Sequence, residues 1–242
     1  MTRAPVRNVA VDRLAQHLFA ADAAADFADE VTAWLTGSPR FRAFADTHRD
    51  KIRKKLRSAA ADADALRDVR AELRVAHLLL ADRRIELAFE AHGSGHGGPD
   101  FTVTFRGATA LDLEVTRLRG DPAAATQGGP LLAKLRQLPP SVPNVLLVAV
   151  EGESAAALDV ASAVRELRAM ADAKDEAFFQ RRAFEGTRDF YHRFLRLGAV
   201  VTWCEGGIGD ARAISWRNGS ARIPVPEPAL RACLAALRGD AA

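Results

Sequence analysis

Two short segments decide how this chain folds: Gly98-Pro99-Asp100-Phe101-Thr102-Val103, and then, after a turn, Leu113-Glu114-Val115-Thr116. Both lie in stretches where apolar and polar residues alternate, which is the period of a β-strand. A third alternating stretch, residues 84–90, precedes them. Together they predict a three-stranded meander in which Asp100, at the start of one strand, comes close to Glu114 on the next.

The third strand predicts an acidic site. Residues two apart in a strand share a face, so Asp112, Glu114 and Thr116 should lie together while the apolar residues between them point into the core. Asp100 lies on the neighbouring strand, and Glu72 lies on the helix expected just upstream. Carboxylate oxygens are the ligands that hard divalent cations prefer. The sequence therefore predicts a divalent-metal site formed by Glu72, Asp100 and Glu114.

The rest of the chain predicts an α/β fold, with a mixed central sheet flanked by helices. We expect a helical N-terminal lobe over residues 1–60 and the α/β domain over 61–242, with one continuous domain as the alternative. Helices are expected over residues 9–36, 40–58, 62–80, 131–138, 155–197 and 227–237, and further strands over 145–150, 199–204 and 212–216. The run at 145–150 is continuously apolar, which indicates a central strand covered on both faces.

The order of helical glutamate, Pro-Asp and Glu-Val-Thr resembles the motif of the PD-(D/E)xK nuclease superfamily, over roughly residues 65–150. The resemblance implies a restriction-endonuclease-like fold and a Mg²⁺- or Mn²⁺-dependent nuclease, with Glu72, Asp100 and Glu114 at the acidic positions. The chain departs from the pattern at Thr116, which stands where the family has a lysine. Threonine cannot supply the positive charge of that lysine.

The helix expected over residues 131–138 offers a replacement for the missing lysine. Lys134 and Gln137 are three residues apart, so they should share a helical face, and this helix could pack beside the meander. Some members of the superfamily have a relocated lysine, and the resemblance therefore makes Lys134 a candidate catalytic residue with Gln137 beside it. The alternative is that Lys134 is a solvated helix residue.

Two basic segments suit a polyanionic partner. Residues 49–57 carry six lysines and arginines on one expected helix, and residues 181–196 carry five arginines among aromatic residues. Such residues attract a phosphate backbone independently of its sequence. Both segments are equally explained as solvated faces, with the aromatic residues building core.

These observations predict a metal-dependent nuclease that hydrolyses phosphodiester bonds in nucleic acid. DNA is favoured, the choice between DNA and RNA stays open, and a homodimer is one possible assembly. The alternative is a catalytically impaired nuclease-fold module that binds nucleic acid or a protein partner.

The glycine-rich stretch at residues 93–98 matches the spacing of a dinucleotide-binding loop. A helix must open at the last glycine of such a loop, whereas Pro99 and Asp100 lead into a strand, so this reading is rejected. His92 and His96 also suggest zinc, but a third histidine or cysteine is not nearby.

Composition sets the outer limits of these predictions. The formal net charge of +3 is too small to require a nucleic-acid partner by itself, and the two cysteines form no metal-binding spacing. The N-terminus does not predict a signal peptide, and there is no run of roughly 20 apolar residues. We therefore expect a cytoplasmic protein.

Overall fold

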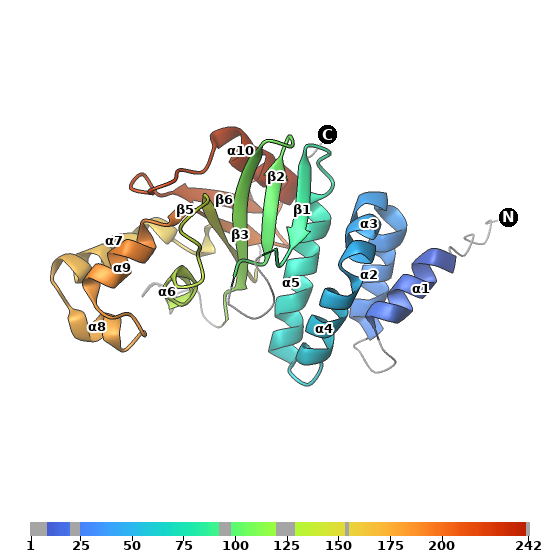
Figure 1. The fold of residues 1–242 in the computed structure, drawn as a ribbon, viewed down its shortest axis with the longest axis horizontal. Helices are drawn as coiled ribbons and strands as arrows, with labels where there is room; N and C mark the ends of the chain where they lie inside the picture. Colours follow the sequence, from blue (N-terminus) through green and yellow to red (C-terminus); the bar gives the residue numbers. More distant parts are fainter. Residues whose placement is uncertain (1–8, 20–24, 92–97, 120–128, 153–154, 241–242) are drawn as a thin grey trace. The chain divides into compact units, whose positions relative to one another are not determined.

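The computed structural model in Figure 1 describes residues 9–19, 25–91, 98–119, 129–152 and 155–240. By its internal contacts the chain divides into two compact units, Met1–Ala81 and Asp82–Ala242, which are considered separately below. The sequence predicts the boundary at residue 60, whereas the contacts group the next helix with the helices before it. The glycine-rich loop with His92 and His96 lies almost wholly outside the described residues.

The first unit consists of helices in its described part. They are α1 (Val9–Leu18), α2 (Ala25–Gly37), α3 (Pro39–Thr47), α4 (Arg49–Ala59) and α5 (Ala63–Leu79). Two of their starts are capped by side chains: Ser38 accepts from the Phe41 amide at 3.2 Å, and Asp62 accepts from the Asp64 amide at 2.8 Å. These oxygens satisfy amides that have no partner within the helix.

The single helix expected over residues 40–58 is wrong, because the structure has two helices there. The chain leaves helical geometry at His48, with φ −106° and ψ 14°. The His48 ring packs 4.9 Å from the ring of Phe44. Neither glycine nor proline occurs at this break, so the usual local signals of a helix end are missing.

The second unit contains a six-stranded mixed sheet in the order β1-β2-β3-β4-β5-β6. Its strands are β1 (Ile85–Phe89), β2 (Phe101–Phe105), β3 (Thr109–Arg117), β4 (Asn144–Val150), β5 (Leu197–Cys204) and β6 (Ala213–Arg217). The first three form an antiparallel meander, β3 to β5 run parallel, and β6 is antiparallel to β5. The predicted α/β fold with a helical N-terminal lobe is confirmed.

In the part of the second unit that the structure describes, five α-helices flank this sheet: α6 (Gly129–Leu135), α7 (Val160–Asp172), α8 (Glu176–Gln180), α9 (Thr187–Phe194) and α10 (Glu227–Arg238). Figure 1 shows α6 to α9 gathered on one side of the unit, with α10 apart from them. Buried residues of α6 to α9 form one core with Leu146, Val148 and Val200 of the sheet. Short 3₁₀ turns occur at Ala155–Ala157 and Gly209–Ala211.

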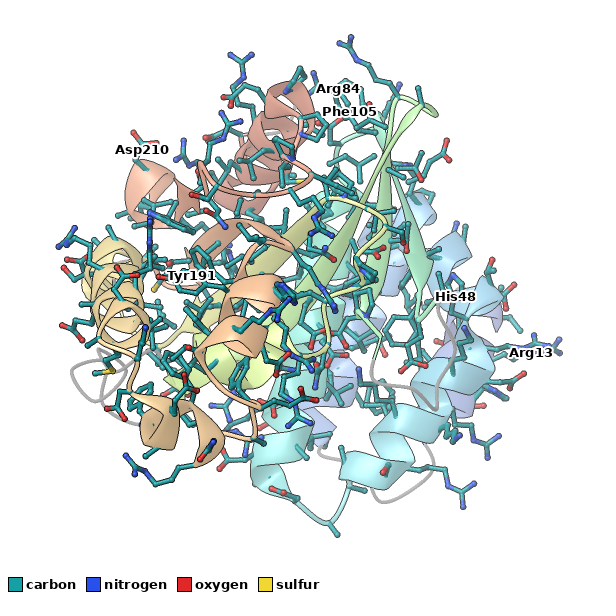
Figure 2. All side chains as sticks on the ribbon, turned by 60° about the vertical axis from the view of Figure 1, so that its left-hand side comes forward. Arg13, His48, Arg84, Phe105, Tyr191 and Asp210 are labelled. Atoms are coloured by element: carbon teal, nitrogen blue, oxygen red, sulfur yellow. The ribbon has the colours of Figure 1, made fainter. Side chains whose placement is uncertain are left out.

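At the start of the meander, Arg84 fixes the first strand to the second. Its guanidinium lies 5.7 Å from the centre of the Phe105 ring, and both residues are labelled together in Figure 2. The same side chain donates to the buried Asp82 carboxylate at 2.7 Å. This end of the meander is thus held by a cation–π contact and an ion pair.

Strand β3 is buried on both faces. Asp112 and Glu114, expected on the face opposite the apolar residues, are only 1% and 2% exposed. The reason is that β3 lies inside the sheet, where Glu114 pairs with Leu146 of β4. Leu146 belongs to the core that α6 to α9 form on one face of the sheet. The face that carries the two carboxylates is therefore also part of the interior.

None of the helices among the described residues is both long and apolar enough to cross a membrane.

Candidate active site

The register of β2 and β3 brings Asp100 beside Glu114. Phe101 pairs with Leu113, and continuing this antiparallel register by one residue places Asp100 opposite Glu114. The Val115 amide donates to Asp100 Oδ2 at 2.9 Å. The backbone pairing of β2 with β3 ends at Phe101, and beyond it the Asp100 carboxylate accepts a β3 amide in the way a strand carbonyl would. This hydrogen bond holds the carboxylate against the β3 backbone.

Glu114 forms an ion pair with a lysine of α6. Lys134 Nζ lies 2.5 Å from Glu114 Oε1; the lysine side chain is 24% exposed and the glutamate side chain 2%. Helix α6 is anchored by Leu131, Leu132 and Leu135, all of them buried. With α6 held by these leucines, the Lys134 side chain reaches the carboxylate while part of it stays in contact with water.

Gln137 completes the surroundings of the lysine. Helix α6 ends at Leu135, so the prediction of a helix reaching Leu138 is wrong. The proline at position 139 disfavours helical geometry at the residue before it, which is consistent with an early end. In the turn that follows, the backbone amide of Gln137 donates to the backbone carbonyl of Lys134 at 2.9 Å. The side-chain oxygen of Gln137, Oε1, accepts from Lys134 Nζ at 3.2 Å. The two side chains meet through this turn.

Asp112, two residues before Glu114 on β3, is a further buried carboxylate and is not one of the predicted site residues. Its Oδ1 accepts from the Thr102 hydroxyl at 2.7 Å, across the paired strands β2 and β3. The signal that could have identified this pair is the strand register, which places a hydroxyl directly opposite a carboxylate. Thr116, at the position of the missing lysine, is half-buried, and Arg117 next to it pairs with Glu151 at 2.8 Å.

Glu72 lies on α5 in the first unit, on the helix where the sequence predicts it. Its side chain is 8% exposed, and Lys55 Nζ from α4 lies 2.5 Å from Glu72 Oε2. The acidic residue therefore has a basic partner within its own unit. That Glu72 converges with Asp100 and Glu114 stays a prediction.

The carboxylates of the second unit fit one kind of metal better than another. Among the residues that the structure describes, no group of three or more His, Cys, Asp or Glu side chains is arranged to hold an ion. Zinc sites use three or four protein ligands, mostly nitrogen and sulfur. Magnesium is commonly held by one or two carboxylates plus waters and substrate phosphate. Asp100 and Glu114 supply an oxygen pair of the second type.

Comparison of this chain with models of protein families, with curated proteins and with solved structures finds no match in any of the three. Function is therefore inferred from the residues themselves.

Proposed function

We propose that this chain is a metal-dependent nuclease that hydrolyses phosphodiester bonds, with Asp100, Glu114 and Lys134 at its active site. One observation carries the proposal: the ammonium of Lys134 lies 2.5 Å from the Glu114 carboxylate at the place where the strand register brings a second carboxylate, Asp100, opposite Glu114. A positive charge from α6 thereby occurs at the acidic site where Thr116 provides none. Gln137 acts as a positioning residue through its contact with the lysine.

Asp100 and Glu114 are the residues that would hold Mg²⁺ or Mn²⁺. When bound, such an ion supplies Lewis-acid charge at the phosphate and lowers the pKa of a coordinated water. In the hydrolysis, water gives up a proton to the solvent as its oxygen bonds to phosphorus, the bond from phosphorus to the leaving ester oxygen breaks, and that oxygen takes up a proton from the solvent. Lys134 donates hydrogen bonds to phosphate oxygens, stabilising the negative charge that gathers on them. The Asp100 carboxylate is kept in position by the Val115 amide.

A second candidate function is a nuclease-fold module that binds nucleic acid without cleaving it, or binds a protein partner. It is favoured by Thr116, which leaves the motif's lysine position without a positive charge. In this alternative the contact between Lys134 and Glu114 only stabilises the fold.

The test is cleavage of labelled double-stranded DNA, single-stranded DNA and RNA by the purified protein in Mg²⁺, in Mn²⁺ and in EDTA. We expect cleavage that requires a divalent ion and falls at least about 100-fold in Asp100→Asn and Glu114→Gln. Both changes keep the size of the side chain, and the asparagine oxygen can still accept from Val115. Wild-type protein that binds nucleic acid but cleaves none of the three would replace the nuclease proposal with the binding module.

A further inference from the structure

A hollow on the side of α4 is lined mainly by basic residues. Its volume is about 460 Å³, and its lining is Asp50, Arg53, Lys54, Arg57 and Ser58. We propose that this α4 hollow binds consecutive phosphates of a nucleic-acid backbone. The inference deepens the proposed function, because it says where the backbone of that substrate is held, yet binding can be measured without cleavage.

The cations of the hollow differ from other cations on the same helix. Arg49 pairs with Asp46 at 3.5 Å, and Lys55 pairs with Glu72 at 2.5 Å. By contrast Arg53, Lys54 and Arg57 form no ion pair with any described residue, and all three line the hollow. Neighbouring cations without counter-charges repel one another, which destabilises the folded state, and a bound anionic ligand removes this repulsion.

Arg53 adds a second, independent observation. Its Nε is buried from solvent and has no hydrogen-bond partner among the described atoms. Buried donors in native structures are nearly always satisfied, so an exception calls for an explanation. Arginine binds phosphate through its fork of N–H donors, and Arg53 lines the hollow, so a phosphate bound there would give this guanidinium an acceptor.

The only acidic residue of the hollow already has a basic partner. Asp50 Oδ1 lies 2.9 Å from His17 Nε2 of α1. The lining is therefore positive overall. Arg53 and Arg57 are four residues apart, roughly 6 Å along the helix axis. Cations repeated at this interval suit a ligand with repeated negative charges better than a single carboxylate.

The composition of α4 favours nucleic acid over an anionic membrane. Its apolar residues Ile52, Leu56 and Ala59 are all buried, at 1%, 3% and 4% exposure. A helix that lies on a membrane needs an exposed apolar face to insert between the lipids. The exposed large apolar residues of the described chain are Val9 and Ile208, neither of them on α4.

The experiment compares two matched double variants. Arg53→Gln/Arg57→Gln removes two cations of the hollow, and Arg181→Gln/Arg188→Gln removes two exposed arginines of the second basic segment. Binding of labelled 20-nucleotide duplex DNA, single-stranded DNA and RNA is measured in EDTA over a range of salt concentrations. We expect the first variant to weaken binding at least about tenfold and to reduce the slope of log K against log salt by about 2, with the control changed less than twofold.

A third variant predicts a gain. Asp50→Asn keeps the shape of the side chain but removes the one negative charge of the hollow, so binding should tighten about two- to fivefold. A gain of affinity cannot come from failed folding. Equal losses in both double variants, or no change in the first, would overturn the proposal, as would wild-type protein that binds phosphatidylserine vesicles and no nucleic acid.

The outcomes also separate this proposal from the nuclease proposal. If wild-type protein binds but does not cleave, and Arg53→Gln/Arg57→Gln binds less, the α4 hollow is supported and the nuclease fails. If wild-type protein cleaves in Mg²⁺ and the Arg53→Gln/Arg57→Gln variant binds and cleaves equally well, the hollow fails and the nuclease stands.

Discussion

Two lysine–glutamate pairs among the described residues, one in each unit, have almost the same N–O distance and exposure. Lys55 and Glu72 join α4 to α5, and Lys134 and Glu114 join α6 to β3; both N–O distances are 2.5 Å. In both, the carboxylate is buried and about a quarter of the lysine side chain is exposed. Geometry of the pair alone therefore cannot identify an active site.

The difference lies in the surroundings. Lys134 has a second acceptor, Gln137 Oε1, and the strand register brings another carboxylate, Asp100, opposite Glu114. Lys55 lies on the same helix as the α4 hollow, where its neighbours are further cations. The first arrangement places two carboxylates, an ammonium and a side-chain amide together, which is the set of groups that the proposed chemistry uses, whereas the second ties one helix to the next. The two pairs can thus be distinguished by how the loss of each lysine changes cleavage and stability.

The largest expected difference is in cleavage. Lys134→Met should lower the cleavage rate at least about 100-fold, because the charge that stabilises the transition state is lost. Lys55→Met should change the rate less than about threefold when assayed at saturating nucleic acid. The rates are measured in Mn²⁺, with circular dichroism to show that both variants are folded. Equal loss of activity in the two variants would remove the distinction drawn between the pairs.

Stability should respond similarly in both pairs. Removing either lysine leaves a buried carboxylate without its ammonium, and we expect the free energy of unfolding to fall by roughly 1–3 kcal/mol. The value stays below that of a fully buried pair because each lysine is partly exposed. Urea unfolding of Lys55→Met and Lys134→Met measures it.

The double variants Lys55→Met/Glu72→Met and Lys134→Met/Glu114→Met are the controls for stability. Each should recover much of the loss, because no isolated charge remains buried. A double variant less stable than its single variant would mean that the glutamate is held mainly by contacts other than the lysine.

Acid should weaken the helical unit through His77. Burial, and then the nearby Arg74, lowers the pKa of His77 to about 4, and its ring stacks on Trp34 at 5.3 Å between centres. In the unfolded chain a histidine takes up its proton near pH 6.5. Between about pH 6.5 and 4 the unfolded state therefore binds the proton and the folded state does not, so stability falls as the pH falls through this window.

His77→Gln is the variant that isolates this effect. Its urea midpoint should change less than that of the wild-type protein between pH 7 and pH 5, since the other titrating groups are shared. Parallel pH profiles in the two proteins would show that His77 does not carry this dependence.

Much of the site could be predicted from the sequence because strand pairing is a local matter. The alternation around Phe101 and Leu113 predicts the two strands, and their register leads directly to the position of Asp100 opposite Glu114. Pairs between helices are different, because they depend on how whole elements pack. The partner of Glu72, Lys55, comes from a segment interpreted only as a basic face, and nothing in the sequence around Lys55 indicates this contact.

The two basic segments show the same limit. Among the arginines of the second segment, Arg182 lies 3.7 Å from the centre of the Phe178 ring, Arg193 pairs with Asp189, and Arg196 donates to the Leu138 carbonyl. The hollow beside them, also about 460 Å³, is lined by Glu176, Glu185 and Asp189 as well as Arg188. A count of arginines predicts two equal surfaces, whereas only the packed structure tells which cations are already engaged.

The smallest effect is expected at Gln137. Gln137→Leu removes the second acceptor of the Lys134 ammonium. Loss of this hydrogen bond between a neutral amide oxygen and a charged, partly exposed ammonium costs about 1 kcal/mol, or roughly fivefold in rate. Because Gln137 only positions the lysine, kcat should fall while KM changes little, and Gln137→Glu, which keeps an acceptor oxygen, should recover the rate. Gln180→Leu, an exposed glutamine of α8, is the matched control and should leave kcat unchanged. A loss in Gln137→Glu as large as that in Gln137→Leu would show that the contact with Lys134 is not what Gln137 contributes.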